Sequence, residues 1–509
     1  MLAAAMASAM GIARAEYPLN WEAATTVNAG SNEFAPYYIA SNRAGTVTQA
    51  AGVYEYGKLW RPLSKDRRFD YSFGAEAWVG IADDVTYSKY SLSAGAFVPN
   101  KQRPAIVWLQ QLWGEVKYRS LFLYAGMKEN DRSLFDSPLG IGDITLSDNA
   151  RPIPQVRAGF IDFQNVPFTK GWLQVRGEIA YGKFADNKWL ENHYNYYNYY
   201  LTTGRWFHYK NIYLRSNPNA RFSAMIGFQH AAQFGGTQTF YDKGVMGRRN
   251  HTKVRFKDFI DVFVQKRGGS GGTAGDQLYY NGDHLGSWDL RFTYRFNDSS
   301  TLTAFVQAPW NDGSGIGKLN GWDGVWGLEY KSGARHGWIT GAQVEYFDFT
   351  NQSGPEHWAP GDYPGTTIPG DATGADDYYN NFFYNGWENN GMAIGSPILK
   401  SPIYNTDGYM LFTDNRIRGF QAGVTGSPTA AWSYRAMVSW RRSWGTPFVP
   451  RASTADETSA MVEATHNFQA VKGLWLTGAV AFDAGKLYDK THVGVLVTLG
   501  YTGNFSLSK

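Results

Sequence analysis

Residues 288–296 read Trp-Asp-Leu-Arg-Phe-Thr-Tyr-Arg-Phe, so an apolar side chain occupies every second position. Successive side chains of a β-strand point to opposite faces, so this stretch predicts a strand with one apolar and one polar face. The same alternation recurs at 172–181, 338–346 and 432–440. In each segment an aromatic residue stands at both ends of the apolar face, as in the aromatic girdles of strands that cross a membrane.

The composition agrees with a barrel in a membrane. The chain of 509 residues contains 57 Gly, 33 Tyr, 19 Trp and no Cys, and only 18% of its residues are charged. Soluble domains carry about 25% charged residues, yet the mean hydropathy of −0.40 is too low for membrane helices. Alternating strands explain both values, because polar positions dilute the apolar face.

Two further features of the composition exclude classes of function. Without cysteine the chain has no disulfide scaffold, thiolate zinc site, iron–sulfur cluster or thiol nucleophile. The net charge of +4 is small for this length and gives no argument for a nucleic-acid partner.

We therefore predict an all-β fold, a single transmembrane antiparallel β-barrel of about 18 strands with a lumen that is at least partly filled. A soluble sandwich would show the same alternation with its apolar face inward, but no Pro/Ser linker divides this long chain into several sandwiches. The candidate strands are 20–29, 37–48, 52–60, 69–81, 87–97, 105–117, 120–127, 155–163, 171–184, 205–216, 221–235, 286–296, 300–309, 323–332, 337–350, 416–425, 430–443, 457–467, 473–483 and 491–505.

The N-terminus resembles the end of a secretory signal. Residues 2–12 are apolar, and Ala13-Arg14-Ala15 has the small-x-small form of a cleavage site. We predict a signal remnant at 1–15 and the barrel at 16–509; the alternative for 2–12 is an ordinary buried helix. Three long connections are predicted as extracellular loops or segments folded into the lumen, at about 186–204, 236–285 and 351–415.

If the apolar faces meet lipid, the opposite faces line the lumen. The predicted lumen-lining residues carry both signs of charge: Arg176, Glu178, Arg291, Arg295, Glu345 and Arg435. One interpretation is an internal network of ion pairs that fills and stiffens the barrel. The other is a polar conduit that binds an anionic polymer, and a packed lumen can still present such groups at its mouth.

Several ordered strings between about residues 120 and 505 carry a family resemblance. They are 147–157 (SDNARPIPQVR), 208–215 (HYKNIYLR), 229–236 (QHAAQFGG), 382–387 (FFYNGW), 394–397 (IGSP), 415–419 (NRIRG), 442–446 (RSWGT) and 482–488 (FDAGKLY). Together they resemble the capsule-assembly Wzi-like outer-membrane proteins, in a Bacteroidetes-like form. Enterobacterial members carry a helical segment that plugs the periplasmic side, and no helical period of that kind is present here.

The resemblance implies a non-enzymatic protein of the Gram-negative outer membrane that binds, helps assemble or anchors capsular or other surface polysaccharide. Its implied partners are outer-membrane lipids, the polysaccharide and other envelope proteins. Candidate polysaccharide-binding residues in the matching strings are Arg157, His208, Lys210, His230, Trp387, Arg416, Arg418 and Arg441. Arginine suits a carboxylated polymer because its planar fork engages both carboxylate oxygens.

The predicted loops also contain groups that suit sugars, which bind to aromatic faces and planar polar side chains. These are Tyr194, Tyr196, Tyr197, Tyr199, Tyr200, Trp358, Asp376, Asp377, Tyr378, Tyr379 and Trp387. Loops rich in Tyr and Asn are also common on barrels that bind no ligand, so this feature alone does not assign a site.

No catalytic residue, metal site or cofactor is predicted. The nine histidines are scattered without metalloprotease spacing, and no P-loop or dinucleotide fingerprint is present. Two alternatives stay open: a passive diffusion porin for small polar or sugar solutes, for which the mixed luminal charge argues, and an enzyme acting on lipid or glycan, for which no catalytic constellation stands out.

Overall fold

The computed structural model describes residues 19–505, apart from 131, 270, 279, 312, 355–356, 359–371, 374–375 and 489. The predicted signal remnant at 1–15 lies outside the described residues. The main element is one antiparallel sheet of 19 strands, in which β8 and β9 both pair with β10. Counting β8 and β9 as one interrupted strand gives 19 − 1 = 18 strands around the wall.

The wall strands follow one another around the sheet in nearly sequential order. They are β1 (Leu19–Gly30), β2 (Gly52–Arg61), β3 (Phe69–Ala82), β6 (Val107–Tyr118), β7 (Leu121–Met127), β8 (Gln155–Phe160) with β9 (Gln164–Asn165), β10 (Leu173–Lys183), β12 (Trp206–Ser216), β13 (Phe222–Phe234), β16 (Asp283–Arg295), β17 (Thr301–Trp310), β18 (Gly324–Lys331), β19 (Gly337–Asp348), β24 (Ile417–Ser427), β25 (Trp432–Gly445), β26 (Pro450–Asn467), β27 (Leu474–Gly485) and β28 (His492–Phe505).

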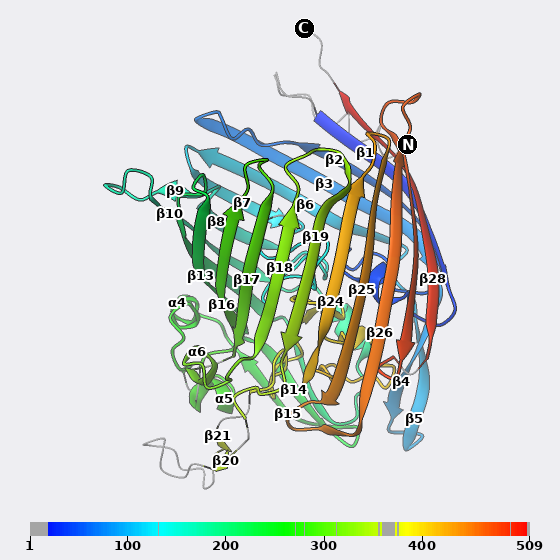
Figure 1. The fold of residues 1–509 in the computed structure, drawn as a ribbon. Coiled ribbons are helices and arrows are strands. Elements are labelled where there is room, and N and C mark those ends of the chain that lie inside the picture. Colours follow the sequence, from blue (N-terminus) through cyan, green and yellow to red (C-terminus); the bar gives the residue numbers. More distant parts are fainter. Residues whose placement is uncertain are drawn as a thin grey trace.

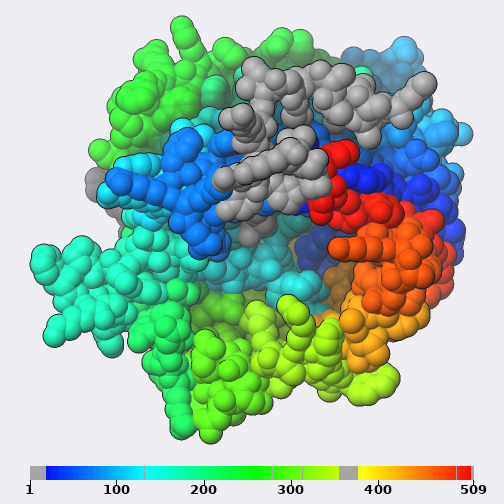
Figure 2. Space-filling model, turned by 90° about the horizontal axis from the view of Figure 1, so that it is seen from above, coloured from blue at the N-terminus to red at the C-terminus, as the bar shows by residue number. Residues whose placement is uncertain are grey.

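Pairing of the first strand with the last closes the sheet into a barrel. β1 is antiparallel to β28 from Leu19↔Phe505 to Gly30↔Gly494. Seen from the end that carries the termini, the red C-terminal strand lies against the blue first strand (Figure 2). The predicted all-β barrel of about 18 strands is confirmed.

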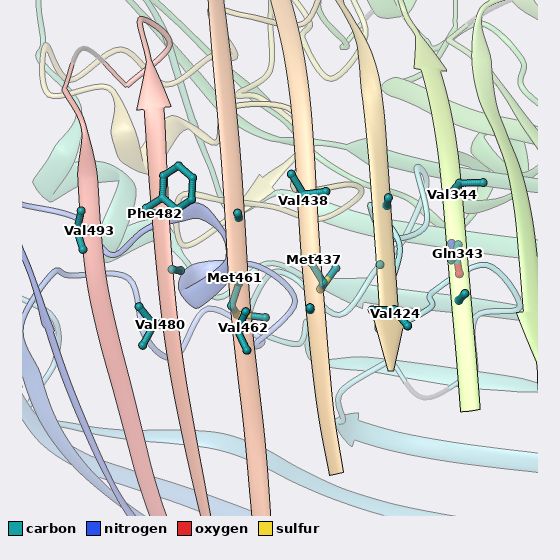
Figure 3. A pocket seen from close by; sticks show the side chains of 16 residues that line it. Gln343, Val344, Val424, Met437, Val438, Met461, Val462, Val480, Phe482 and Val493 are labelled. Atoms are coloured by element: carbon teal, nitrogen blue, oxygen red, sulfur yellow. The ribbon is translucent and has the colours of Figure 1, made fainter. Parts of the chain in front are cut away.

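The alternation divides the side chains of each strand between the outside and the lumen, as the sequence predicts. In β16, Trp288 and Phe292 are exposed on the outer face, whereas Ser287 and Asp289 are buried inside. A shallow apolar groove of about 600 Å³ crosses the outer face where alanines and valines of β19 and β24–β27 meet. Figure 3 shows Val344, Val424, Val438, Val462 and Phe482 on five successive strands of this wall, β19 and β24–β27.

Two of the predicted wall strands are not part of the barrel. Residues 37–48 enter the lumen and begin with a short helix, α2 (Tyr37–Ala40), in which all four residues are buried. A run that is apolar on every side suits a position enclosed by the inner wall better than a place in the wall. Residues 87–97 belong to a separate hairpin, β4 (Val85–Ser91) with β5 (Ala96–Gln102), which pairs only with itself.

The two ends of the barrel differ in their connections. The connections at the end with the termini are short, such as 119–120 between β6 and β7 and 296–300 between β16 and β17. The opposite end carries the long ones, with the β4–β5 hairpin, α4–α6, β14, β15, β20 and β21 (Figure 1). Because barrels in the outer membrane have short periplasmic turns, we call the end with long connections the extracellular end.

The remaining elements belong to these long connections. They are α3 (Asn187–His193), β11 (Tyr199–Thr203), β14 (Gly236–Asp242), β15 (Val245–Thr252), α4 (Phe256–Phe263), α5 (Ala274–Leu278), α6 (Gly313–Ile316), β20 (His357–Trp358), β21 (Ala372–Thr373), β22 (Glu388–Asn389), β23 (Met392–Ala393) and η1 (Pro402–Tyr404). None of the helices in the described ranges has the length and apolar character of a membrane-spanning helix.

Three connections fold into the barrel and fill it: 31–51, 128–154 and 376–415. Most of their residues are buried, including Ile39, Ile144 and Trp387. The second segment is bonded to the wall, since the backbone N–H of Ile141 donates to Glu345 of β19 at 2.8 Å. The third is bonded to the second, since the Trp387 indole donates to the Thr145 carbonyl at 3.0 Å. The predicted filling of the lumen is therefore confirmed.

We expect a charge on the outer face to destabilise the barrel strongly. Leu290 lies on that face between the exposed rings of Trp288 and Phe292. Leu290→Arg should lower the free energy of unfolding in lipid vesicles by about 1–3 kcal/mol, because the cost of a cation on the lipid face falls from about 2–4 kcal/mol at the bilayer midplane to about 0–1 kcal/mol at the interface. Denaturant titration of the reconstituted protein measures this loss, with Leu290→Phe as the control. Equal stability of the two variants would contradict a lipid-facing position.

Candidate functional site

The six predicted lumen-lining residues lie on the inner face or at its ends, and each has a polar partner. Three of them form ion pairs: Glu178 with Arg157 at 2.9 Å, Arg291 with Glu329 at 2.7 Å and Arg435 with Glu463 at 2.7 Å. The other three form hydrogen bonds with the backbone. Arg176 donates to the Arg132 carbonyl at 2.9 Å, Arg295 donates to the Pro218 carbonyl at 3.2 Å, and Glu345 accepts from the Ile141 N–H at 2.8 Å. Four of the six, Arg176, Arg291, Glu345 and Arg435, bond to the filling segment 128–154 and so join it to the wall.

The centre of the lumen is tied together by buried carboxylates. The Gln229 amide donates to both Asp143 and Asp289, at 2.9 and 2.8 Å, and so links the segment 128–154 to strands β13 and β16. Burial raises the pKa of Asp143. Burial and the nearby Asp143 raise the pKa of Asp136 to about 7. A cavity of about 20 Å³ lies beside this segment, next to Arg151 and Phe207, which is room for a water molecule but not for a sugar.

The eight predicted binding residues are not brought together. Three of them are enclosed in the lumen: Arg157, Trp387 and Arg441. Arg157 pairs with Glu178 and lies over the Tyr209 ring. Trp387 packs against Phe207, and Arg441 lies over the Tyr37 ring. All three are almost fully buried. Trp387 belongs to the third filling segment, Arg441 contacts the first through Tyr37, and Arg157 contacts wall residues. None of the three is accessible to a polymer.

Another three predicted residues lie on the outer face of the wall. His208 and Lys210 alternate with the luminal Tyr209 on β12 and contact Phe263 of α4, whereas His230 lies on the neighbouring strand β13. The His208 ring stacks on Tyr181, and Nε2 of His230 is 2.8 Å from Nδ1 of His284. His208 and Lys210 thus help to dock a surface helix onto the barrel, whereas His230 packs against His284 and Trp310.

The last two lie at the extracellular rim. Arg416 donates to the Thr350 carbonyl at 3.1 Å, and Arg418 pairs with Asp348 at 2.7 Å. Arg418 is the one residue of the eight that is clearly exposed, so it is the one that a ligand in solvent reaches most easily.

An aromatic surface covers part of the extracellular end. It comes from four connections: the β4–β5 hairpin, the stretch 194–200 leading into β11, the β14–β15 hairpin, and the residues around 382 and 409. The rings, which are half-buried or exposed, are those of Tyr90, Phe97, Tyr196, Tyr197, Tyr199, Tyr200, Phe240, Tyr241, Phe382, Phe383 and Tyr409. We call this set the aromatic surface.

Ring contacts hold the aromatic surface together across its four connections. Tyr197 lies 4.8 Å from Tyr90 and 4.9 Å from Phe97, measured between ring centroids. Tyr200 lies 5.0 Å from Phe240 and 5.6 Å from Phe382. Backbone bonds support this packing, since the Tyr90 N–H donates to the Asn195 carbonyl at 2.7 Å. The surface is therefore a built structure and not a set of isolated rings.

Cations border the aromatic surface. Nζ of Lys89 lies 4.7 Å from the centroid of the Tyr196 ring. Burial raises the pKa of Tyr200, and the positive charge of Arg248 opposes that rise. Burial likewise raises the pKa of Tyr241, which the positive charge of Arg249 opposes. Both arginines are exposed, so they are free to meet a ligand that carries negative charge.

The sequence pointed to only part of this surface. Four of the predicted sugar-binding loop residues lie on it: Tyr196, Tyr197, Tyr199 and Tyr200. Five others from the same prediction are buried, namely Tyr194, Asp376, Tyr378, Tyr379 and Trp387, and Asp377 is partly buried. The Trp358 side chain lies outside the described residues. Tyr90, Phe97 and Phe240 were missed, because their neighbours on the surface come from other connections. The one feature of the sequence that could have indicated these three residues is that they stand in hairpins that expose aromatic side chains.

Among the residues that the structure describes, no group of three His, Asp or Glu side chains is arranged to hold a metal ion.

The fold is similar to that of known outer-membrane barrels, although neither a family model nor a curated protein matches the sequence. One similar structure is Wzi from Escherichia coli, an outer-membrane protein involved in group 1 capsule assembly and a carbohydrate-binding β-barrel. It aligns with a TM-score of 0.54 and 10% sequence identity, over 95% of this chain and 85% of Wzi. OccAB2 from Acinetobacter baumannii aligns with a TM-score of 0.47 and 8% identity, over 96% of this chain and 98% of OccAB2. OccK3 from Pseudomonas aeruginosa aligns with a TM-score of 0.44 and 11% identity, over 96% of this chain and 96% of OccK3. The likeness to Wzi shows the fold, a barrel of outer-membrane type.

Proposed function

We propose that this chain is an outer-membrane barrel that binds an acidic surface polysaccharide at its extracellular end and catalyses no reaction. The observation that carries the proposal is the aromatic surface, which four connections assemble and which Lys89, Arg248 and Arg249 border. We infer that this surface faces the outside of the cell, where capsular or other surface glycan lies, because the long connections of outer-membrane barrels are extracellular.

The chemistry of the surface suits a polymer of acidic sugars. The C–H faces of pyranose rings pack on aromatic faces, and the half-exposed tyrosines add hydroxyl groups at their edges. A carboxylate on the sugar forms charge-assisted hydrogen bonds with arginine and lysine, which are about twice as strong as neutral ones. Adjacent rings such as Tyr197 and Tyr200 offer several stacking positions, as a repeating polymer requires.

The filled lumen supports a binding role over the alternative, a diffusion channel. A barrel of 16–18 strands encloses an aqueous channel unless something occupies it. Here the segments 31–51, 128–154 and 376–415 occupy it, and buried hydrogen bonds tie them to the wall and to one another. The similarity in fold to Wzi, which is described as carbohydrate-binding, also agrees with the proposal.

Binding of detergent-purified protein to a glycan array that includes acidic capsular polysaccharides tests the proposal. We expect specific binding, and we expect the double variant Tyr197→Ala/Phe382→Ala to lose about tenfold or more in affinity, since each stacking contact contributes roughly 0.5–1.5 kcal/mol. Phe168→Ala is the matched control, because Phe168 is fully exposed at the other end of the barrel. If the wild-type protein bound no glycan, or if the double variant bound as well as Phe168→Ala, the proposal would be wrong.

A further inference from the structure

Helix α4 lies on the outside of the barrel at its extracellular end, beside β13 (Figure 1), and contacts β10, β12 and β13. One side of the helix is docked onto the wall. The Phe259 ring packs edge-on against Tyr181, Trp206 and Phe234, with centroids 5.1–5.5 Å apart. The Tyr181 hydroxyl donates to the Phe259 carbonyl at 2.7 Å, and the Lys210 ammonium donates to the carbonyl of Phe263. The helix is therefore held in a defined orientation.

The opposite side of α4 is apolar and uncovered. Phe256, Ile260 and Val264 recur at intervals of four residues, so they form one row along the helix and the residue that follows it. Phe256 is 81% exposed, and the other two are about half exposed. A helix that is docked through one apolar side and exposes a second apolar side needs a second apolar environment.

Basic residues flank this exposed row. Lys253, Arg255, Lys266 and Arg267 are exposed on either side of α4. The two acidic residues of the segment are engaged within it: Asp258 accepts from the backbone N–H of Arg255 at 2.6 Å, and the buried Asp261 lies 3.6 Å from Lys257. The exposed charge around the row is therefore positive.

The connection that contains α6 lies near α4 at the same end of the barrel (Figure 1) and marks where the lipid-facing wall ends. Trp288, at the extracellular end of the apolar face of β16, donates from its indole to the Ile316 carbonyl in the connection that contains α6. The same connection exposes Leu319 and Trp322, the latter to 81%. Exposed aromatic and apolar side chains at the end of a membrane wall mark the level of the lipid headgroups.

We propose that α4 is an interfacial helix that inserts its row of Phe256, Ile260 and Val264 into the outer leaflet and binds the phosphate groups of an outer-leaflet lipid with its flanking basic residues. Amphipathic helices with basic flanks bind anionic lipid surfaces in this way. The inference rests on the membrane placement of the barrel proposed above and is independent of sugar binding. It gives the protein a lipid partner of defined chemistry on one side of its wall.

The depth of α4 is tested with single-cysteine variants, which the absence of native cysteine makes possible. An environment-sensitive fluorophore is attached at Phe256→Cys or Ile260→Cys, and the protein is reconstituted into vesicles that contain spin-labelled lipid. We expect quenching at both positions, as at Val306→Cys on the lipid-facing wall, and none at Ser93→Cys on the tip of the β4–β5 hairpin. Absence of quenching at Val306→Cys would refute the membrane placement itself. Quenching at Val306→Cys but not at 256 or 260 would overturn only the inference about α4.

The phosphate preference is tested with lipid A, a phosphorylated lipid, against phosphatidylcholine in mixed micelles. The wild-type protein should retain lipid A preferentially. The variant Lys253→Gln/Lys266→Gln/Arg267→Gln should lose about 100-fold in that preference, since each basic residue near a charged surface contributes about fivefold. Lys89→Gln, on the aromatic surface, is the control and should change nothing. Equal retention of the two lipids by the wild type, or unchanged retention by the triple variant, would overturn the phosphate part of the inference.

Discussion

Replacing Arg205 by leucine is expected to lower the free energy of unfolding by about 3–5 kcal/mol, the usual cost of removing one partner from a buried ion pair. Arg205 is fully buried and contacts two buried carboxylates, Asp186 at 2.5 Å and Glu388 at 2.9 Å. It joins the connection before β12 to the third filling segment. Without it, two carboxyl groups would face each other in a site that water does not reach. Denaturant titration of the detergent-folded protein, or loss of heat-modifiable mobility on a gel, measures the effect.

The same cluster makes a prediction for pH. Burial and the neighbouring Asp186 raise the pKa of Glu388 to about 8, and the charge of Arg205 only partly opposes them. A raised pKa in the folded state means that the folded protein holds a proton which the unfolded chain releases at lower pH. The stability that this proton provides is complete below about pH 4.5 and is lost as the pH rises through about 8. Glu388→Gln should remove this dependence and be milder than Arg205→Leu at pH 7.

A matched control separates burial from charge. Arg442 and Asp456 form an ion pair of similar geometry, at 2.6 Å, but both side chains are exposed at the extracellular end of the wall. Exposed pairs contribute little, so Arg442→Leu should leave the stability almost unchanged. Equal effects at positions 205 and 442 would contradict the argument that the cluster around Arg205 is shielded from water.

The wall of the barrel could be predicted from the sequence because its signal is local. Alternation over nine residues, as in 288–296, needs no knowledge of the partner strand, and 18 of the predicted segments became wall strands. The same signal failed for 87–97, because a hairpin outside the barrel alternates as a wall strand does. The prediction of a wall strand at 37–48 was wrong for a different reason. That segment alternates only weakly, and it is buried on all sides within the lumen.

The candidate site was harder to predict because its residues meet only through the fold. The matching strings of the resemblance directed attention to residues such as Arg157, Arg441 and Trp387, which are buried in the lumen. Residues under such packing constraints produce distinctive strings without binding a ligand. Phe97 and Tyr197, by contrast, are about 100 positions apart in the sequence and 4.9 Å apart in space. Neither position carries a local pattern that points to the other.

The largest functional effect is expected from opening the lumen. The third filling segment can be removed with its ends undisturbed, because Asn380 and Phe412 exchange two hydrogen bonds of 2.8 Å each and thus lie side by side. Replacing 381–411 by a short Gly/Ser linker deletes Trp387 and the core residues around it. The wall strands, whose pairings do not involve this segment, should still close.

In planar bilayers the wild-type protein should show no stable conductance, and the shortened protein should show a stable open level. The reason is geometric: a wall of 18 strands encloses a space that water fills once a filling segment is gone. A control in which only the tip of the β4–β5 hairpin, residues 92–95, is replaced should stay closed, since that hairpin lies outside the barrel. A wild-type protein that conducts steadily would instead favour the diffusion channel, because its filling segments would then have to leave a continuous path around them. A shortened protein that folds but stays closed would mean that 31–51 and 128–154 seal the barrel by themselves.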